Sequence, residues 1–540
     1  MARVGEVSLT PREQVVLAAV RRRLTNAEIA AELVVSIRTV ESHIASLRRK
    51  IGTDTRAGLI RAAEEDAARW FDKDRDGGGL RRREQAKAAA GRRDWKAAYE
   101  AYAGLGSRTG TDLDGLAEAT WWLGRMTESI SRYTEAYRAH CAEGDLRSAA
   151  RSSFLLALSS RLVGEPAQSL GWMHRCGRLL QSLPEGPEHG YALYLQIAAL
   201  LGNGDLDAAV DSAKRMQDIG RRFEDPTLLA LGVYFEGRAQ IKLARVQRGL
   251  ALLDEAMVAA LSDGLGPLWT GAIYCGLMDA CNELQDVRRA FEWTEATRRW
   301  CEPLPLTSLY PGICRVHRAQ VLHTHGAWQQ AEEEALGACR DMLGVDVFAV
   351  ADGHYEVGEV RRLRGDLAGA EQAYMRAHEY GRDPQPGLAL LRLAQGDVDA
   401  AASSIAAAIA SATGGRLQWA PLHAAQVSIA LAAGDLALAA ASADEVADTA
   451  AAFDSAGLLA EGYRCRGSVL LAAGRPGEAL SMLRTAFTAW QQLDAPYEAA
   501  TTRRLLAEAY RALGDGDGAA REDAAAQARF DQLGVVPLAR

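Results

Sequence analysis

The stretch from Ser36 to Ile51 combines residue types that can contact DNA with a spacing that places them on one side of a helix. At 100° per residue, four apolar residues fall within a sector of about 60° and predict the buried face: Val40, Ile44, Leu47 and Ile51. The opposite side carries Arg38, Ser42, Ala45, Ser46 and Arg49, flanked by Glu41 and Arg48. Arginine bonds guanine edges or phosphates, serine bonds either, and alanine can touch the thymine methyl group. A solvated helix face would show a similar mixture, so this stretch alone leaves both interpretations open.

Helix-start signals and a tight turn position this stretch. Thr10-Pro11-Arg12-Glu13 has a capping Thr, Pro at the first helical position and Glu three residues after the cap. Thr25-Asn26-Ala27-Glu28 is a second capping box and opens a short second helix. Ser36 caps the third helix, Gly52 ends it, and a fourth helix is expected over 56–63. Four short helices with a tight turn between the second and the third are typical of a helix-turn-helix domain.

Four segments of this region carry one combined pattern: Leu9-Thr10-Pro11-Arg12-Glu13, Thr25-Asn26-Ala27-Glu28-Ile29-Ala30, Ser36-Ile37-Arg38-Thr39-Val40-Glu41-Ser42-His43-Ile44 and Leu47-Arg48-Arg49-Lys50-Ile51-Gly52. In this combination they closely resemble the LuxR-type DNA-binding domain over about residues 5–66. The resemblance implies a helix-turn-helix core at 26–45, a third helix that reads the major groove, and dimerisation through the fourth helix. Glu41 and Ala45 depart from the family, which often has Lys and a polar or basic residue there. The domain also stands at the start of this chain, whereas in the family it more often closes the chain.

The residues and the resemblance together give a candidate set of contacts to double-stranded DNA: Thr25, Asn26, Arg38, Thr39, Glu41, Ser42, Ala45, Ser46, Arg48 and Arg49. Base readout is expected from Arg38, Ser42, Ala45 and Arg49, and phosphate contacts from Thr25, Arg38, Arg48 and Arg49. The resemblance further implies a homodimer whose contact lies around Leu59, Ile60 and Ala63.

Charge is divided unevenly along the chain of 540 residues, whose net charge is −8. Residues 1–63 carry 11 Lys/Arg and 6 Asp/Glu, a balance of +5, so the remainder carries −13. A small basic head on a large acidic body is typical of a polyanion-binding module joined to a second domain. The eight cysteines form no C-x-x-C pair, and no stretch of about 18 residues is apolar throughout. We therefore expect a cytoplasmic protein with reduced thiols and no membrane contact.

A Gly-Asp phrase returns along the rest of the chain at a nearly constant step of about 40 residues. It begins at Gly204, Gly365, Gly396, Gly434 and Gly514, with variants at Gly164, Gly326 and Gly474. One step, from Gly365 to Gly396, is clearly shorter than the others. Each Gly is expected to end one helix, and each Asp can cap the next. A fixed period of this size predicts stacked helical hairpins, about ten to twelve of them.

This repeat resembles tetratricopeptide-like arrays and, more closely, the long-repeat domains of MalT-like regulators. The segments Ala489-Trp490-Gln491-Gln492-Leu493-Asp494-Ala495-Pro496-Tyr497-Glu498-Ala499-Ala500 and Phe530-Asp531-Gln532-Leu533-Gly534 support the resemblance. The expected fold class is all-α: an N-terminal four-helix LuxR-type helix-turn-helix domain followed by a large α-solenoid of tetratricopeptide-like hairpins. We expect a head domain at 1–66, a linker at 67–89 and a repeat array at 90–536. The linker is suggested by the charged run 72–76 and by Gly77-Gly78-Gly79.

No pattern of a catalytic or cofactor site is found in the sequence. Neither the phosphate-binding string G-x-x-x-x-G-K-S/T nor G-x-S-x-G occurs. His317, His323 and His325 have no Cys or carboxylate at ligand spacing, so no metal site is expected there. We therefore expect a protein that is not an enzyme and has no cofactor.

One aromatic group in the array is a candidate effector pocket: Trp269, Tyr274, Trp293, Trp300 and Tyr310. An aromatic-lined concave pocket for a peptide or small molecule would have this composition. Ordinary packing between helices would have it too, and is the favoured alternative.

These observations favour a sequence-specific DNA-binding transcriptional regulator. Its head domain would bind double-stranded DNA as a homodimer, and its array would receive a signal from a protein, a peptide or a small molecule. RNA polymerase is a further candidate partner. The alternative is a non-enzymatic interaction scaffold in which the helix-turn-helix contacts protein.

Overall fold

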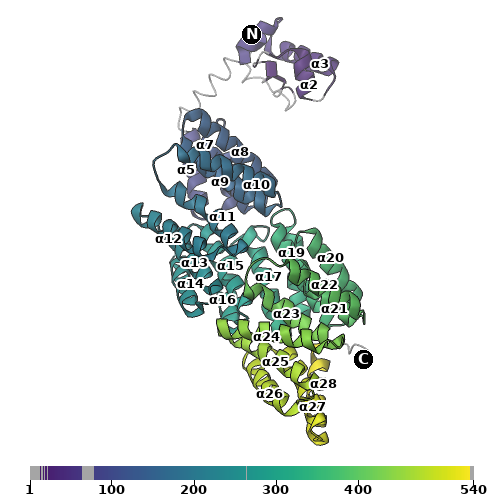
Figure 1. The fold of residues 1–540 in the computed structure, drawn as a ribbon. Helices are drawn as coiled ribbons and strands as arrows, with labels where there is room; N and C mark the ends of the chain where they lie inside the picture. Colours follow the sequence, from purple (N-terminus) through teal and green to yellow (C-terminus); the bar gives the residue numbers. More distant parts are fainter. Residues whose placement is uncertain are drawn as a thin grey trace. The chain divides into compact units, whose positions relative to one another are not determined.

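The computed structural model describes residues 24–33, 35–63, 78–262 and 264–535, together with Glu13, Val16, Leu17, Ala19, Val20 and Arg22. The chain divides into two compact units, Met1–Ala119 and Thr120–Arg540, which we call unit 1 and unit 2. All regular elements in the described ranges are helices, as the sequence predicts (Figure 1). Among these helices, none has the length and apolar content needed to span a bilayer.

Unit 1 contains the helix-turn-helix elements α2 (Asn26–Glu32) and α3 (Ile37–Ile51), followed by helical residues 56–63. Three further helices are α5 (Gly78–Gly91), α6 (Trp95–Ala103) and α7 (Gly110–Trp122), the last of which continues into unit 2. Helix α5 occupies the second part of the segment 67–89 that was expected as a linker, because residues 80–90 are rich in strong helix formers. Residues 64–77 lie outside the described part, so the domain boundaries stay a prediction.

Unit 2 is a succession of antiparallel helices, and each helix packs on the next in the chain (Figure 1). Their bounds are α8 (Met126–Glu143), α9 (Leu146–Leu162), α10 (Pro166–Gln181), α11 (Pro187–Asn203), α12 (Leu206–Arg222), α13 (Pro226–Lys242), α14 (Val246–Leu261), α15 (Pro267–Glu283), α16 (Val287–Cys301), α17 (Leu309–Thr324), α18 (Trp328–Met342), α19 (Val347–Leu363), α20 (Leu367–Glu379), α21 (Gly387–Ala394), α22 (Val398–Ser411), α23 (Arg416–Ala432), α24 (Leu436–Phe453), α25 (Ala456–Ala472), α26 (Pro476–Gln492), α27 (Pro496–Ala512) and α28 (Gly516–Leu533). From α9 to α27 each odd-numbered helix also contacts the next odd-numbered helix, so the odd-numbered helices form one layer of the solenoid.

The repeat period follows from helix length. Helices α25, α26 and α27 each have 17 residues and start at Ala456, Pro476 and Pro496. A hairpin of two such helices and two short turns therefore takes about 40 residues, the period seen in the sequence. The one short step of the sequence repeat has the same origin, because α20 has 13 residues and α21 only 8.

The Gly-Asp junctions form as the sequence predicts. Gly396 has φ +82°, a left-handed conformation that ends α21 and that a residue with a Cβ adopts at a cost. Asp397 then caps α22, with its carboxylate accepting a bond from the Ala400 amide at 3.0 Å. Asp435 caps α24 in the same way, with 2.9 Å to the Leu438 amide.

Contacts between distant segments hold successive turns of the solenoid together in unit 2. The Ser455 hydroxyl at the start of α25 donates to the carbonyl of Leu284 at the end of α15. A Cβ on Gly326 would lie 2.4 Å from Leu533 Cδ2, so this glycine allows the turn before α18 to approach α28 closely. Both contacts therefore join segments that lie more than 150 residues apart in the chain.

Candidate nucleic-acid interface and array cavity

Helix α3 has the buried face that its sequence predicts. Its buried residues are Val40, Ile44, Leu47 and Ile51. They join a core with residues of the first, second and fourth helices, among them Val16, Ile29 and Leu59. The helix starts where the Ser36 hydroxyl accepts a bond from the Thr39 amide at 3.1 Å, and it ends at Gly52 with φ +73°. The apolar stripe and the two caps therefore set which side of α3 faces outward.

The outward side of α3 carries most of the candidate DNA contacts. The exposed members are Thr25 before α2 and, on α3, Arg38, Thr39, Glu41, Ser42, Ala45 and Arg49. Arg38, Ser42 and Ala45 follow at spacings of four and three residues, and Arg49 lies four residues further on, so the four share one face. A helix with this face presents arginines beside small groups, which suits entry into a major groove.

Ser46 and Lys50 connect α3 to the first helix. The Ser46 hydroxyl donates to Oε1 of Glu13 at 2.8 Å, and the Lys50 ammonium donates to Oε2 at 2.7 Å. Glu13 is only 4 % exposed, so its carboxylate needs these partners. Ser46, a candidate DNA contact, is therefore occupied with packing inside the domain.

The predicted capping box at the start of α2 is present. The Thr25 amide donates to Oε2 of Glu28 at 2.7 Å, and the Glu28 amide donates to Oγ1 of Thr25 at 3.3 Å. The hydrogen bonds from the Thr25 amide and hydroxyl lower the pKa of Glu28 below its usual value.

Arg56 is a structural residue that the sequence analysis missed. Its guanidinium donates to Oδ1 of Asn26 at 2.6 Å and to the carbonyl of Leu24, so it connects the fourth helix to the start of α2. Asn26, a candidate DNA contact, is half-buried in this contact. A single Arg in the sequence TDTRAG gives no signal for such a bond, because its partner lies 30 residues earlier.

A cavity of about 700 Å³ lies beside the C-terminal half of α3. Its charged lining residues are Glu41, Arg48, Arg49, Asp54 and Arg56, which leaves one net positive charge. Nε of Arg48 is buried there without a hydrogen-bond partner in the described part of the chain. This side of the head domain therefore attracts anions.

Two of the three residues expected at a dimer contact lie inside one copy of the domain. Leu59 is fully buried and Ala63 is 7 % exposed, and both belong to the core of the head domain. Ile60 is half-buried at the edge of that core. Of the three, Ile60 alone keeps apolar surface for a second copy.

Residues 7–63 match the model of the bacterial regulatory proteins of the luxR family. The head domain belongs to the luxR family. It is also similar to the response regulator Rre1 of Synechocystis sp., with 47 % identity over 58 residues. These residues are 11 % of this chain and 25 % of Rre1, so the match spans a quarter of that relative.

Two solved structures share a low level of similarity with most of this chain. The hetero-tetramer Cut9-Hcn1 of the APC/C has a TM-score of 0.36 and 11 % identity, with coverage of 85 % of this chain and 96 % of that chain. The apo form of the quorum sensor NprR from B. thuringiensis has a TM-score of 0.34 and 12 % identity, with coverage of 70 % and 98 %. At such TM-scores we draw no functional conclusion for this chain.

The five aromatic residues of the candidate effector pocket are packed between helices. Tyr274 and Tyr310 are 2 % and 3 % exposed, and each lies beside Trp300 at about 5.5 Å between ring centroids. Trp269 stacks on Tyr191 from α11 at 5.3 Å, and Trp293 packs on the core of α12–α16. None of the five lines the cavity described next.

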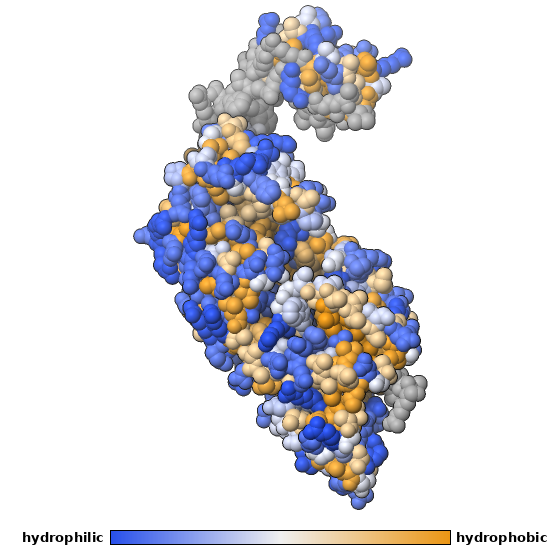
Figure 2. All heavy atoms as spheres, viewed as in Figure 1, coloured by the Kyte–Doolittle hydropathy of each residue, from blue (hydrophilic) through white to orange (hydrophobic). Residues whose placement is uncertain are grey.

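A cavity of about 630 Å³, which we call the array cavity, lies among the odd-numbered helices of unit 2. Its lining comes mainly from α15, α17, α19, α21, α23, α25 and α27. Figure 2 shows hydrophobic residues gathered in the region where Figure 1 places α21, α22 and α23. The lining residues run from Cys281 to Thr501, so no local pattern in the sequence could predict this cavity.

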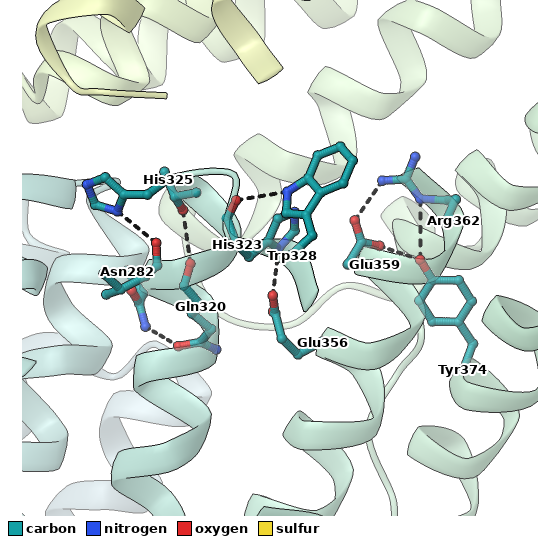
Figure 3. A network of polar contacts seen from close by, with 11 residues as sticks. Asn282, Gln320, His323, His325, Trp328, Glu356, Glu359, Arg362 and Tyr374 are labelled. Carbon is teal, nitrogen blue, oxygen red and sulfur yellow. Dashed lines mark hydrogen bonds and ion pairs between the residues drawn. The ribbon is translucent and has the colours of Figure 1, made fainter. Parts of the chain in front are cut away.

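Asn282, Gln320 and Arg362 on the wall of the array cavity belong to a network of polar contacts (Figure 3). Oε2 of Glu359 accepts a bond from Arg362 at 2.7 Å, and the Tyr374 hydroxyl donates to Oε1 of the same carboxylate at 2.5 Å. Burial favours the neutral acid, but Arg362 keeps the pKa of Glu359 below its usual value. The Asn282 amide donates to the Gln320 amide oxygen at 2.5 Å, so α15 and α17 are joined across the wall.

His323 forms a second charged pair close to this network. Its Nδ1 lies 2.6 Å from Oε1 of Glu356, and the Trp328 indole donates to its backbone carbonyl at 3.1 Å. Burial lowers the pKa of His323, but the Glu356 carboxylate outweighs burial and raises the pKa to about 9. Within the described ranges, no group of three or more His, Cys, Asp or Glu side chains is placed to hold a metal ion.

Proposed function

We propose that this protein is a sequence-specific DNA-binding transcriptional regulator whose array receives a signal. The observation that carries the proposal is the outward face of α3 in a luxR-family domain, where Arg38, Ser42, Ala45 and Arg49 stand exposed above a separately buried stripe. Arginine and serine donors beside a small apolar group are suited to reading base edges.

The contacts divide into base readers and phosphate binders. Arg38, Ser42, Ala45 and Arg49 would face the bases, with the two arginines also able to bond phosphates. Thr25 at the start of α2 and Arg48 on the wall of the cavity beside α3 would bind phosphates. Glu41 repels phosphate and is suited instead to accept a bond from a cytosine amino group.

A second copy would pair through the fourth helix of the head domain. Ile60 would form the apolar centre of this small contact, since Leu59 and Ala63 already serve the domain core. Two recognition helices related by a two-fold axis would then bind an inverted repeat. The array would bind a protein, a peptide or a small molecule and thereby change this pairing.

Capture of genomic DNA fragments by the full-length protein tests the proposal. The wild type is compared with Arg38→Ala/Arg49→Ala protein and with Arg81→Ala protein, which removes one exposed arginine on α5, outside both α3 and the fourth helix. We expect an inverted-repeat sequence enriched by the wild type and by Arg81→Ala protein, and lost in the double variant. Equal enrichment by the double variant would refute the base-reading role of α3. No enriched sequence with any of the three proteins would favour an interaction scaffold.

A further inference from the structure

Four buried polar atoms on the wall of the array cavity have no hydrogen-bond partner among the described residues. They are Oε1 of Gln285, Nε1 of Trp490, Oε2 of Glu498 and Oγ1 of Thr501. Buried polar atoms in folded proteins are nearly always paired, and a group of them around one cavity calls for a missing partner. Trp490 is only 5 % exposed, so its indole N–H cannot turn to bulk water instead.

Two of these groups stand side by side. Glu498 and Thr501 lie three residues apart on α27, so they share the face of the helix that meets the cavity. The carboxylate offers acceptors only, and the hydroxyl can accept as well as donate. Together they form a site for a group that donates several hydrogen bonds.

The cations that face Glu498 are already committed to other carboxylates. Arg464 on α25 donates from Nε to Oε2 of Glu461 at 2.9 Å, and His323 bonds Glu356 at 2.6 Å. Arg362, also on the cavity wall, bonds Glu359. The charge left over on the wall is therefore that of Glu498, and burial raises its pKa, as expected for a carboxyl that lacks a close counter-ion.

Much of the rest of the wall is apolar, beside the polar side chains of Asn282, Gln320, Thr324 and Ser428. The apolar part includes Leu363 on α19, Leu390 and Leu393 on α21, Ala424 on α23 and Leu458 on α25. The volume of about 630 Å³ lies in the range of cavities that enclose a small organic ligand. A ligand that fits must combine an apolar body with one charged group.

We propose that the array cavity binds an amphipathic organic cation, with its ammonium group on Glu498 and Thr501 and its apolar body against α21 and α23. The Trp490 indole donates to an acceptor on the same ligand where one is present. An acidic ligand fits less well, because it would have to separate Arg362 or Arg464 from its own carboxylate. This inference rests on the proposed function, since it supplies the chemistry of the signal that the array receives.

Isothermal titration of the full-length protein without DNA tests the proposal. The probes are phenylbutylamine, phenylbutanol and phenylbutyrate, which share one apolar body and differ in a cationic, neutral or anionic end. We expect saturable binding of the amine, at least about tenfold tighter than binding of the alcohol or the acid. Glu498→Gln should remove this preference. Glu508→Gln, which removes an exposed carboxylate from the same helix, should keep it.

Three outcomes would overturn the proposal: no saturable binding of the amine, equal binding of the three probes, or an unchanged preference in Glu498→Gln protein. The comparison of probes on the wild type stands even if Glu498→Gln protein does not fold. The titration contains no DNA, so a negative titration would not affect the result of the genomic capture. A negative capture would likewise leave the titration interpretable.

Discussion

The head domain and the array form their sites in opposite ways. The DNA face of the head domain is composed of residues 25–49, most of them on one helix, with their apolar supports in the same stretch. The array cavity collects residues from Cys281 to Thr501, which only the superhelical turn brings together. A site on one helix is readable from helical periodicity, whereas a site between turns of a solenoid depends on the three-dimensional fold.

The head domain and the array also differ in whether their arginines are paired with carboxylates. In the head domain Arg38 and Arg49 are exposed and available to a polyanion. In the array Arg362 and Arg464 are each paired with a glutamate on the same helix. The exposed arginines of the head domain attract a polyanion from solution. The paired arginines of the array leave the carboxylate of Glu498 as the group that can select a charged ligand.

The largest expected effect comes from Leu47→Ala, which tests whether the two regions are stabilised separately. Leu47 is fully buried in the core of the head domain, and its truncation should cost about 2–5 kcal/mol. A domain of this size cannot absorb that loss, so DNA binding should disappear while the array unfolds at its usual temperature. Thermal melts followed by circular dichroism give the measurement. Leu483→Ala is the matched change in the array core. It should lower the melting temperature of the array and leave that of the head domain unchanged. Equal shifts of both transitions by either variant would break the comparison.

The array should lose stability on the basic side of neutral pH through His323. Its folded pKa of about 9 lies above the ordinary value of 6.5, so its charged form stabilises the fold fully below pH 6.5. This contribution, about 3 kcal/mol, is lost as the pH rises through about 9. Urea unfolding at about pH 6 and about pH 10 measures it. His323→Gln should flatten the pH dependence, and His174→Gln, at an exposed site, should leave it as it is.

Arg49→Ala should affect the head domain alone. If Arg49 reads a base, the loss of DNA affinity should be about 1–3 kcal/mol, measured by fluorescence anisotropy on the captured sequence. Arg81→Ala, at an exposed site on α5, should bind as the wild type does. The titration of the array cavity with phenylbutylamine should not change in Arg49→Ala protein, and a change there would couple two sites that we treat as separate.

The smallest effect is expected at the capping box of α2, on the acidic side of neutral pH. The hydrogen bonds from Thr25 lower the pKa of Glu28 below its ordinary value of 4.5, so the ionised carboxylate stabilises the head domain above that pH. The contribution is lost as the pH falls below 4.5. Glu28→Gln should therefore lower the melting temperature of the head domain slightly at about pH 7 and should match the wild type at about pH 3. Glu41→Gln, at an exposed site on α3, serves as the control.

Much of the fold could be predicted because its signals are local. The buried stripe of α3, the Thr25–Glu28 capping box and the Gly-Asp junctions each depend on residues a few positions apart, and the structure confirms them. The short step between Gly365 and Gly396 also has a local cause in the short helices α20 and α21.

The features that could not be predicted from the sequence depend on residues that lie far apart in the chain. The bond from Arg56 to Asn26 and the role of Ser46 on Glu13 span 30 and 33 residues. Glu498 has the position of an ordinary acidic residue in the first turn of a helix, and only the fold shows that its side chain meets a cavity. For the aromatic group, composition left a pocket and ordinary packing open and favoured packing, and Tyr274 and Tyr310 are buried between helices.

The most direct test of the central claim is the salt dependence of DNA binding by the full-length protein. On the captured inverted repeat, the logarithm of the association constant should fall linearly with the logarithm of the salt concentration, with a slope of about −0.9 for each phosphate contacted. Arg38→Ala/Arg49→Ala protein should bind more weakly and with a shallower slope. A wild-type affinity that is unchanged by salt, or the same for the inverted repeat and for unrelated DNA, would contradict the assignment of α3 as a reader of DNA.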